Sequence, residues 1–202
     1  MMITVEEASR LYLENDVAHD FDHVLRVLAL AEGIGQEEGA NLEIVRAAAL
    51  LHDIGGRQRS FHARTGAQQA REILQGHPPE KVEAVAQAIA THSFREKSTP
   101  QTLEAQVLYD ADKLDAIGAI GVARAYAVSG QMGHRLWAPV SADYQGEARG
   151  TPEHTAVHEF VFKLSRLKET LFTPRAKVIA EERHRYMVGF FARLEREVKG
   201  EL

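Results

Sequence analysis

The stretch Ala47-Ala48-Ala49-Leu50-Leu51-His52-Asp53-Ile54-Gly55-Gly56 decides how this chain folds and what it can bind. Its first five residues are apolar, which is typical of a buried helix. The pair His52-Asp53 then places two strong metal-ligand side chains directly after that helix. The two glycines that follow force a loop. We therefore predict a buried helix over residues 42–51, with an imidazole and a carboxylate at its end.

Two further candidate ligands lie elsewhere along the chain, His23 before the pair and Asp112 after it. Each lies on its own helix-like segment, so only the fold can bring the four side chains together. Two imidazoles and two carboxylates can hold one divalent cation. They suit Mn, Fe, Co, Ni or Zn better than Mg, because imidazole is softer than Mg prefers. Such a site activates a bound water and polarises a phosphoryl group, which points to hydrolysis.

The composition indicates one globular domain without a nucleic-acid or membrane partner. With 202 residues the chain is long enough for one well-cored domain and too short for two. A net charge of −5 argues against coating a nucleic acid, and the absence of cysteine excludes disulfides and thiolate ligands. No signal core or spanning segment is evident, so we expect a cytoplasmic protein. We leave open whether it forms a homodimer.

Apolar periodicity predicts helices nearly throughout, and no strands. We expect them at about residues 4–14, 21–38, 42–51, 63–74, 80–92, 103–113, 114–129 and 175–198, with others from Thr151-Pro152 to about 171. The segment 130–150 is rich in glycine and loses periodicity. Irregular segments of about this length are usually functional lids or mobile loops. We predict one all-α domain over residues 1–202 that includes a lid-like segment at 130–150.

Three basic side chains are candidates for binding a phosphorylated substrate. Arg26 lies one helical turn after His23 and shares its face. Lys113 adjoins Asp112, and Arg57 belongs to a basic loop just after the His-Asp pair. The alternative for each is an ordinary ion pair or a solvated side chain.

Three side chains are candidates for the chemistry itself. Asp53 could act as both a ligand and a catalytic group. His92 follows an apolar helix face and could lie beside the metal or the substrate phosphate. Asp115 lies one turn past Asp112 and could transfer a proton or orient a ligand. The structural alternatives are a capping or core histidine for His92 and a helix-terminal acid for Asp115.

The order His23, His52-Asp53, Asp112 resembles the HD superfamily of metal-dependent phosphohydrolases, which is named for the His-Asp pair. The stretches 19–23, 110–124 and 158–164 look like a branch of small bacterial HD proteins. The resemblance covers most of the chain. It implies an all-helical HD bundle, one or more divalent ions, and cleavage of phosphoric anhydrides or esters. Some relatives in this branch are nucleotide pyrophosphatases.

This chain departs from the patterns of two groups of HD enzymes, and these departures narrow the expected number of metal ions and the expected class of enzyme. Binuclear HD phosphodiesterases have two further histidines between the pair and the last Asp. In this chain His62, His77 and His92 occupy that interval, but His77 precedes two prolines in a turn. We therefore predict a site for one ion and leave a second site at His62 and His92 open. HD 5′-nucleotidases carry a Glu where this chain has Gly56, so their acid/base group does not transfer.

The sequence thus predicts a metal-dependent phosphohydrolase whose expected substrate is a nucleotide or another small phosphorylated molecule. One alternative is a catalytically silent HD module that binds a nucleotide and signals through a partner. Another is a helical nucleic-acid-binding protein, against which the net charge and the lack of a basic helix stripe argue.

Overall fold

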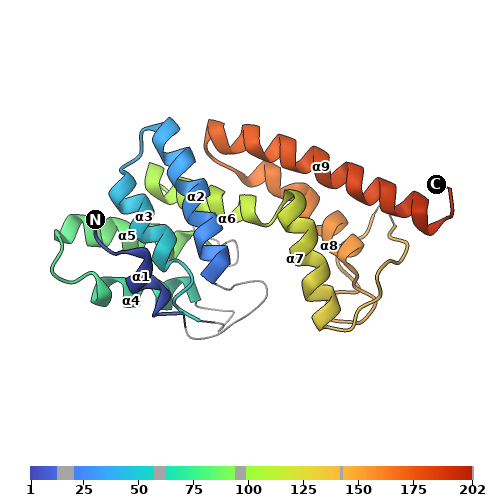
Figure 1. Ribbon diagram of the computed structural model, residues 1–202, viewed down its shortest axis with the longest axis horizontal. Coiled ribbons are helices and arrows are strands. Elements are labelled where there is room, and N and C mark those ends of the chain that lie inside the picture. Colours follow the sequence, from blue (N-terminus) through green and yellow to red (C-terminus); the bar gives the residue numbers. More distant parts are fainter. Residues whose placement is uncertain (13–20, 57–61, 94–98, 142, 202) are drawn as a thin grey trace. The chain divides into compact units, whose positions relative to one another are not determined.

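The chain is all-α, as the apolar periodicity predicted (Figure 1). The computed structural model describes residues 1–12, 21–56, 62–93, 99–141 and 143–201. Within these ranges there is no strand, only an isolated bridge between Gln75 and His77. None of the helices in the same ranges is long and apolar enough to cross a membrane.

The chain forms two compact units. Unit 1 comprises residues 1–112 and 171–176, and unit 2 comprises residues 113–170 and 177–202. Two of the three boundaries fall within continuous helices, α6 (Leu103–Asp115) and α9 (Pro174–Val198). The single-domain boundary and the lid role of 130–150 remain predictions.

Unit 1 contains all the predicted metal ligands. Its helices are α1 (Val5–Ser9), α2 (Phe21–Glu38), α3 (Leu42–Leu51), α4 (His62–Ile73), α5 (Pro79–Thr91) and most of α6. Helices α2 and α3 have the predicted bounds, and α4 and α5 begin and end one residue earlier than predicted. Helix α1 is shorter than predicted, and the rest of the expected first helix falls partly outside the described residues.

Helix α3 is the buried centre of this unit. The Asn41 side chain caps it by accepting hydrogen bonds from the backbone N–H groups of Glu43 and Ile44, at 3.1 and 3.5 Å. From Ala47 to Leu51 every side chain is buried. Helices α2 and α5 contact α3, and α4 contacts α5. The end of α3, where His52 and Asp53 follow, therefore lies within the packed interior.

The turn after Asp53 needs a glycine because α4 approaches it closely. A Cβ at Gly55 would lie 2.1 Å from the carbonyl oxygen of His62 and 2.6 Å from the backbone nitrogen of Gly66. The sequence predicted a loop here, and the close approach of α4 explains why the loop needs a glycine. The missing side chain lets the start of α4, which carries His62, come against the turn that carries Asp53.

A buried carboxylate holds residues 171–176 to the remainder of unit 1. Asp110 accepts hydrogen bonds from the backbone N–H groups of Phe172 and Thr173, at 2.9 and 2.7 Å, and from the Thr173 hydroxyl at 2.7 Å. Its side chain is fully buried, so these three bonds replace its hydration. Because Asp110 lies on α6 two residues before Asp112, it also fixes the helix that presents that ligand.

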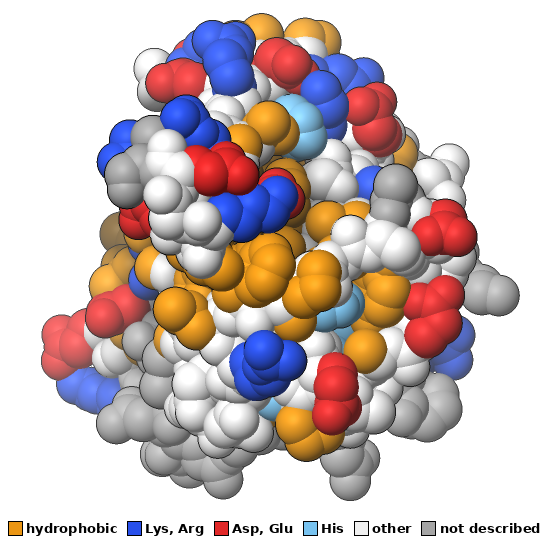
Figure 2. Space-filling view, turned by 90° about the vertical axis from the view of Figure 1, so that its right-hand side faces the viewer, with side chains coloured by type: hydrophobic (Ala, Val, Ile, Leu, Met, Phe, Trp, Pro, Cys, Tyr) orange, Lys and Arg blue, Asp and Glu red, His pale blue; other side chains and the backbone are white. Residues whose placement is uncertain are grey.

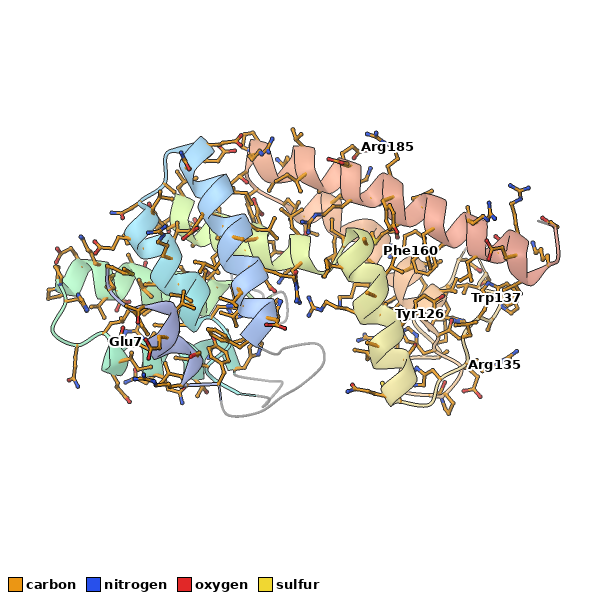
Figure 3. The ribbon with its side chains drawn as sticks, in the orientation of Figure 1. Glu7, Tyr126, Arg135, Trp137, Phe160 and Arg185 are labelled. Carbon is orange, nitrogen blue, oxygen red and sulfur yellow. The ribbon has the colours of Figure 1, made fainter. Side chains whose placement is uncertain are left out.

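Unit 2 consists of the end of α6, α7 (Gly118–Gln131), α8 (Ala156–Phe162), the 3-10 helix η2 (Leu164–Thr170) and most of α9. Aromatic rings pack within it: Phe160 stacks on Phe191 with centroids 4.3 Å apart, and Tyr126 lies 6.4 Å from the same ring. Figure 3 labels Tyr126 on α7 and Phe160 on α8.

The predicted helix start at Thr151-Pro152 is wrong. Thr155 caps α8 instead, with a capping box formed with His158, while the Thr151 hydroxyl donates to the carbonyl of Ala148 within a turn. The described residues between α7 and α8 form turns and bends, which agrees with the predicted loss of periodicity. Side chains hold this segment in place. The Tyr144 hydroxyl lies 2.9 Å from His154 Nδ1, and His154 Nε2 lies 3.0 Å from Glu159.

The surface of this part of the chain carries exposed apolar groups among charged ones (Figure 2). Met132 and Leu136, just after α7, are 57% and 66% exposed. Arg135 between them is exposed as well. Residues in the predicted lid-like segment therefore present both apolar and basic side chains to solvent.

Two Gly→Ala changes should have opposite effects on stability. Gly55→Ala should destabilise the protein by about 1–3 kcal/mol, because its methyl group meets backbone atoms that cannot move aside. Gly33→Ala on the exposed face of α2, where a Cβ meets nothing within 4 Å, should stabilise it by about 0.5–1 kcal/mol. Urea unfolding followed by circular dichroism measures both. Equal effects of the two changes would contradict the close approach at Gly55.

Candidate metal centre

Three of the four predicted ligands lie close together in unit 1. His23 is the third residue of α2, His52 follows the last residue of α3, and Asp112 is in the last turn of α6. One potential ligand atom from each lies within 4.8 Å of the others. His23 Nε2 is 3.3 Å from His52 Nε2 and 3.6 Å from Asp112 Oδ1. The fold therefore brings together side chains presented by three helices.

Asp53 joins this group through one carboxylate oxygen. Its Oδ2 lies 3.7 Å from His23 Nε2 and 3.6 Å from His52 Nε2. Its Oδ1 lies 3.7 Å from the Nε2 atom of His92. The Asp53 carboxylate thus has a different set of imidazoles next to each of its two oxygens.

The second set is itself a possible ligand group. Ligand atoms of Asp53, His62 and His92 also lie within 4.8 Å of one another. His62 is the first residue of α4, and His92 follows the end of α5. The rings of the two histidines are 5.3 Å apart. The His62–His92 pair that the sequence left open as a second site is therefore adjacent to Asp53.

Hydrogen bonds to helix-end carbonyls determine which ring nitrogen of two histidines carries the proton. His52 Nδ1 lies 2.8 Å from the carbonyl oxygen of Ala49, and His92 Nδ1 lies 2.6 Å from that of Ile89. A carbonyl oxygen can only accept, so each Nδ1 must donate. In the neutral rings Nε2 then carries no proton, and it lies 3.6 Å from an Asp53 carboxylate oxygen in His52 and 3.7 Å in His92.

Electrostatics keeps these groups in the protonation states that a cation requires. Burial lowers the pKa of His52 from 6.5 to about 4, despite the attraction of Asp53. Burial alone would raise the pKa of the Asp53 carboxyl, but attraction to the imidazoles of His52 and His92 outweighs it and holds this pKa well below 3.8. A neutral imidazole beside an ionised carboxylate, with no thiolate present, is a donor set that fits a divalent cation.

The three residues predicted to bind substrate belong to neither of these ligand groups. Arg26 lies one turn after His23 on α2 and is half-buried, and Lys113 is half-buried next to Asp112 on α6. Arg57 lies outside the described residues. Binding of substrate by these three side chains remains a prediction.

Asp115 has a clear structural partner. It is buried, and its Oδ2 accepts a hydrogen bond from Arg124 Nη1 at 2.8 Å; the same nitrogen donates to the Asp115 carbonyl at 3.2 Å. Arg183 donates to the Leu114 carbonyl at 2.6 Å. These arginines satisfy carbonyls at the end of α6, where cations also interact favourably with the helix dipole. A proton-transfer role for Asp115 remains a prediction.

Sequence reasoning missed one residue beside the centre, Tyr12. Its hydroxyl donates a hydrogen bond of 2.9 Å to the carbonyl of Leu50, in the last turn of α3. Burial and the nearby Asp53 carboxylate raise its pKa. Nothing in the local pattern distinguishes Tyr12 from an ordinary packing aromatic, since its partners lie far away in the sequence.

Comparison with known proteins identifies the family. The family model of the HD domain matches residues 20–117, which include all the ligands described above. The chain is also 36% identical over 188 residues to the protein YpgQ of Bacillus subtilis, a match that spans 90% of this chain and 85% of YpgQ. The chain belongs to the HD-domain superfamily. This confirms the resemblance of the sequence to HD proteins.

Solved structures of HD proteins resemble the whole chain. The crystal structure of B. subtilis YpgQ in complex with ADP matches with a TM-score of 0.75 and 32% identity, over 96% of this chain and 92% of that one. An HD-superfamily hydrolase from Bacillus thuringiensis matches with a TM-score of 0.73 and 29% identity, over 96% and 94%. A predicted HD-superfamily hydrolase from an uncultured Thermotogales bacterium matches with 0.67 and 28%, over 96% and 90%. The family match, the hydrolase relatives and the two ligand groups together identify this protein as a metal-dependent hydrolase.

The metal-free protein should lose stability as the pH falls from about 6.5 to about 4. In this window the unfolded chain protonates His52 whereas the folded chain keeps it neutral, so the unfolded state binds more protons and is favoured by acid. Urea unfolding at a series of pH values measures the loss. His52→Gln should flatten the profile over this window. A wild-type profile that is flat over this window would contradict a neutral, buried His52.

Proposed function

We propose that this protein hydrolyses a phosphoanhydride or phosphoester bond of a nucleotide. The observation that carries the proposal is the pair of histidines whose Nδ1–H groups are held by Ala49 and Ile89, so that both Nε2 atoms face the Asp53 carboxylate. The occurrence of ADP in the YpgQ crystal structure supports a nucleotide as the ligand. The match covers nearly all of both chains, so the comparison extends beyond the ligand motif.

The four predicted ligands would hold one divalent cation. They are His23, His52, Asp53 and Asp112. A bound divalent cation would polarise the phosphoryl oxygens and lower the pKa of a water toward about 7. We assign the more tightly bound ion to this group because it has two carboxylates. The group of Asp53, His62 and His92 has only one, and shares it.

His92 is the residue best placed to take a proton from the attacking water. Its Nδ1–H is committed to Ile89, so Nε2 is the atom that can accept. The imidazolium that forms would lie 3.7 Å from Asp53 Oδ1, whose charge would stabilise it. In the reaction the water oxygen forms a bond to phosphorus, the bridging P–O bond breaks, and the leaving oxygen takes up a proton.

Basic side chains would balance the charge of the substrate. The chain as a whole carries a net charge of −5, so a polyphosphate needs local cations in addition to the metal. Arg26, Lys113 and Arg57 are our candidates. A nucleoside triphosphate cleaved between its α and β phosphates, with release of pyrophosphate, is the specific reaction we favour.

Replacement of Asp53 should abolish both metal binding and hydrolysis. We expect Asp53→Asn to lower turnover by more than about 100-fold, because the change removes a ligand and the charge that holds the imidazoles in place. Phosphate and pyrophosphate release would be followed over nucleoside mono-, di- and triphosphates with Mn, Mg, Co, Ni and Zn in turn. Glu182→Gln, the equivalent carboxylate-to-amide change at an exposed site on α9, should have wild-type activity.

The outcomes of this panel are distinct. Turnover that requires both a metal and Asp53 supports the proposal and identifies the bond that is cleaved. Retained turnover in Asp53→Asn would refute the mechanism. Metal and nucleotide binding without turnover of any substrate would instead favour the silent sensing module.

Counting bound ions tests the assignment of the tighter site. We expect one Mn²⁺ per chain at micromolar free metal, with unchanged stoichiometry in His62→Ala and loss of this ion in His23→Ala. Equilibrium dialysis with elemental analysis gives the number. Two ions in the wild type and one in His62→Ala would show that the second group binds as tightly as the first.

A further inference from the structure

Tyr12 contacts both of the segments that lead into the first two histidine ligands. Its hydroxyl donates to the carbonyl of Leu50 at 2.9 Å, and its ring lies 5.4 Å from that of Phe21. Leu50 is in the last turn of α3, two residues before His52. Phe21 is the first residue of α2, two residues before His23. One side chain thus connects the elements that present both imidazoles.

The hydrogen bond from Tyr12 satisfies the Leu50 carbonyl in the last turn of α3. The last carbonyls of an α-helix have no partner within the helix, and those of α3 lie in the interior. His52 Nδ1 satisfies the carbonyl of Ala49, and the Tyr12 hydroxyl satisfies the next one, that of Leu50. The end of α3 is therefore held by a ligand on one carbonyl and by Tyr12 on its neighbour.

Tyr12 is itself held in place by the segment before it. Helix α1 begins with a capping box, in which the Thr4 side chain and the Glu7 carboxylate exchange hydrogen bonds with each other's backbone. Ala8 is fully buried, and α1 contacts α3. The backbone N–H of Tyr12 donates to the carbonyl of Ser9 at 3.4 Å. A folded helix thus delivers the phenol to the end of α3.

The phenol also stays in the form that can donate. Burial and the charge of Asp53 raise the pKa of Tyr12, while a hydrogen bond from the Asp53 backbone acts in the opposite direction. The same hydroxyl is therefore close to the main chain of the ligand-bearing turn as well as to Leu50.

We propose that Tyr12 is a positioning residue of the metal centre, which fixes the end of α3 so that His52 and Asp53 present their ligand atoms together. The proposal rests on the metal centre of the proposed function. It assigns a role to residues 1–12, which carry none of the predicted metal ligands.

Removal of the single hydroxyl tests the proposal. Tyr12→Phe keeps the ring that meets Phe21 and leaves the Leu50 carbonyl without its donor. We expect the dissociation constant for Mn²⁺, measured by isothermal titration calorimetry, to rise about 10-fold. The visible d–d absorption of the Co²⁺ form should also shift, because it reports the geometry of the ligands.

A matched control removes the same atom elsewhere. The Tyr126 hydroxyl (Figure 3) is buried in unit 2 and has no hydrogen-bond partner among the described residues, so Tyr126→Phe should leave Mn²⁺ affinity and the Co²⁺ spectrum unchanged. Phe21→Leu removes the ring partner and keeps the phenol. It should weaken Mn²⁺ binding by less than Tyr12→Phe, and it serves as a second test if Tyr12→Phe does not fold.

The results separate this proposal from the one on which it rests. If the wild type binds no Mn²⁺ or Co²⁺, the metal centre itself is wrong. If the wild type binds Mn²⁺ and Tyr12→Phe binds it within twofold with the same Co²⁺ spectrum, Tyr12 is only a packing residue and the positioning role is refuted. The same refutation holds if Tyr12→Phe does not fold and Phe21→Leu binds Mn²⁺ as the wild type does.

Discussion

The hydrogen bond from a histidine Nδ1 to the carbonyl three residues earlier is the interaction on which the rest of this site depends. It occurs at His52 and again at His92, each directly after a helix. In both places it uses a carbonyl in the last turn of the helix, so the same bond helps to end the helix and fixes the ring. The nitrogen left without a proton is the one that can bind a cation. Local helix termination and metal chemistry are thus achieved by the same bond.

The helix ends also contribute charge to the centre. His52 and His92 follow the carboxyl ends of α3 and α5, and Asp112 lies in the last turn of α6. Helix carboxyl ends carry partial negative charge, which favours a cation nearby. Three such ends together with two carboxylates give this part of an already acidic protein a strong local preference for a divalent ion. The same arrangement repels a polyphosphate, which is why cationic side chains are needed to bind one.

Sequence reasoning found the elements that depend on local pattern. The apolar stripe of α2 and the buried run of α3 gave the right bounds, and the His-Asp pair marked the centre. It misplaced the start of α8, because Thr151-Pro152 is a favourable cap whose hydroxyl is used in a turn, while Thr155 forms the cap. It also missed Tyr12 and the anchoring role of Asp110. Both act on backbone groups tens of residues away, and such pairings are set by tertiary packing that a single sequence does not reveal.

The anchor at Asp110 has a consequence for the order in which the protein matures. Its partners lie 62 and 63 residues further along the chain. Until the ribosome has released that part of the chain, a carboxylate destined for the interior has no donors, and the helix that carries Asp112 cannot settle against its neighbours. The metal centre is therefore completed late in synthesis, although its other five side chains all lie within the first half of the chain. A nascent chain that stops before residue 172 would carry all of the ligands and still lack a finished site.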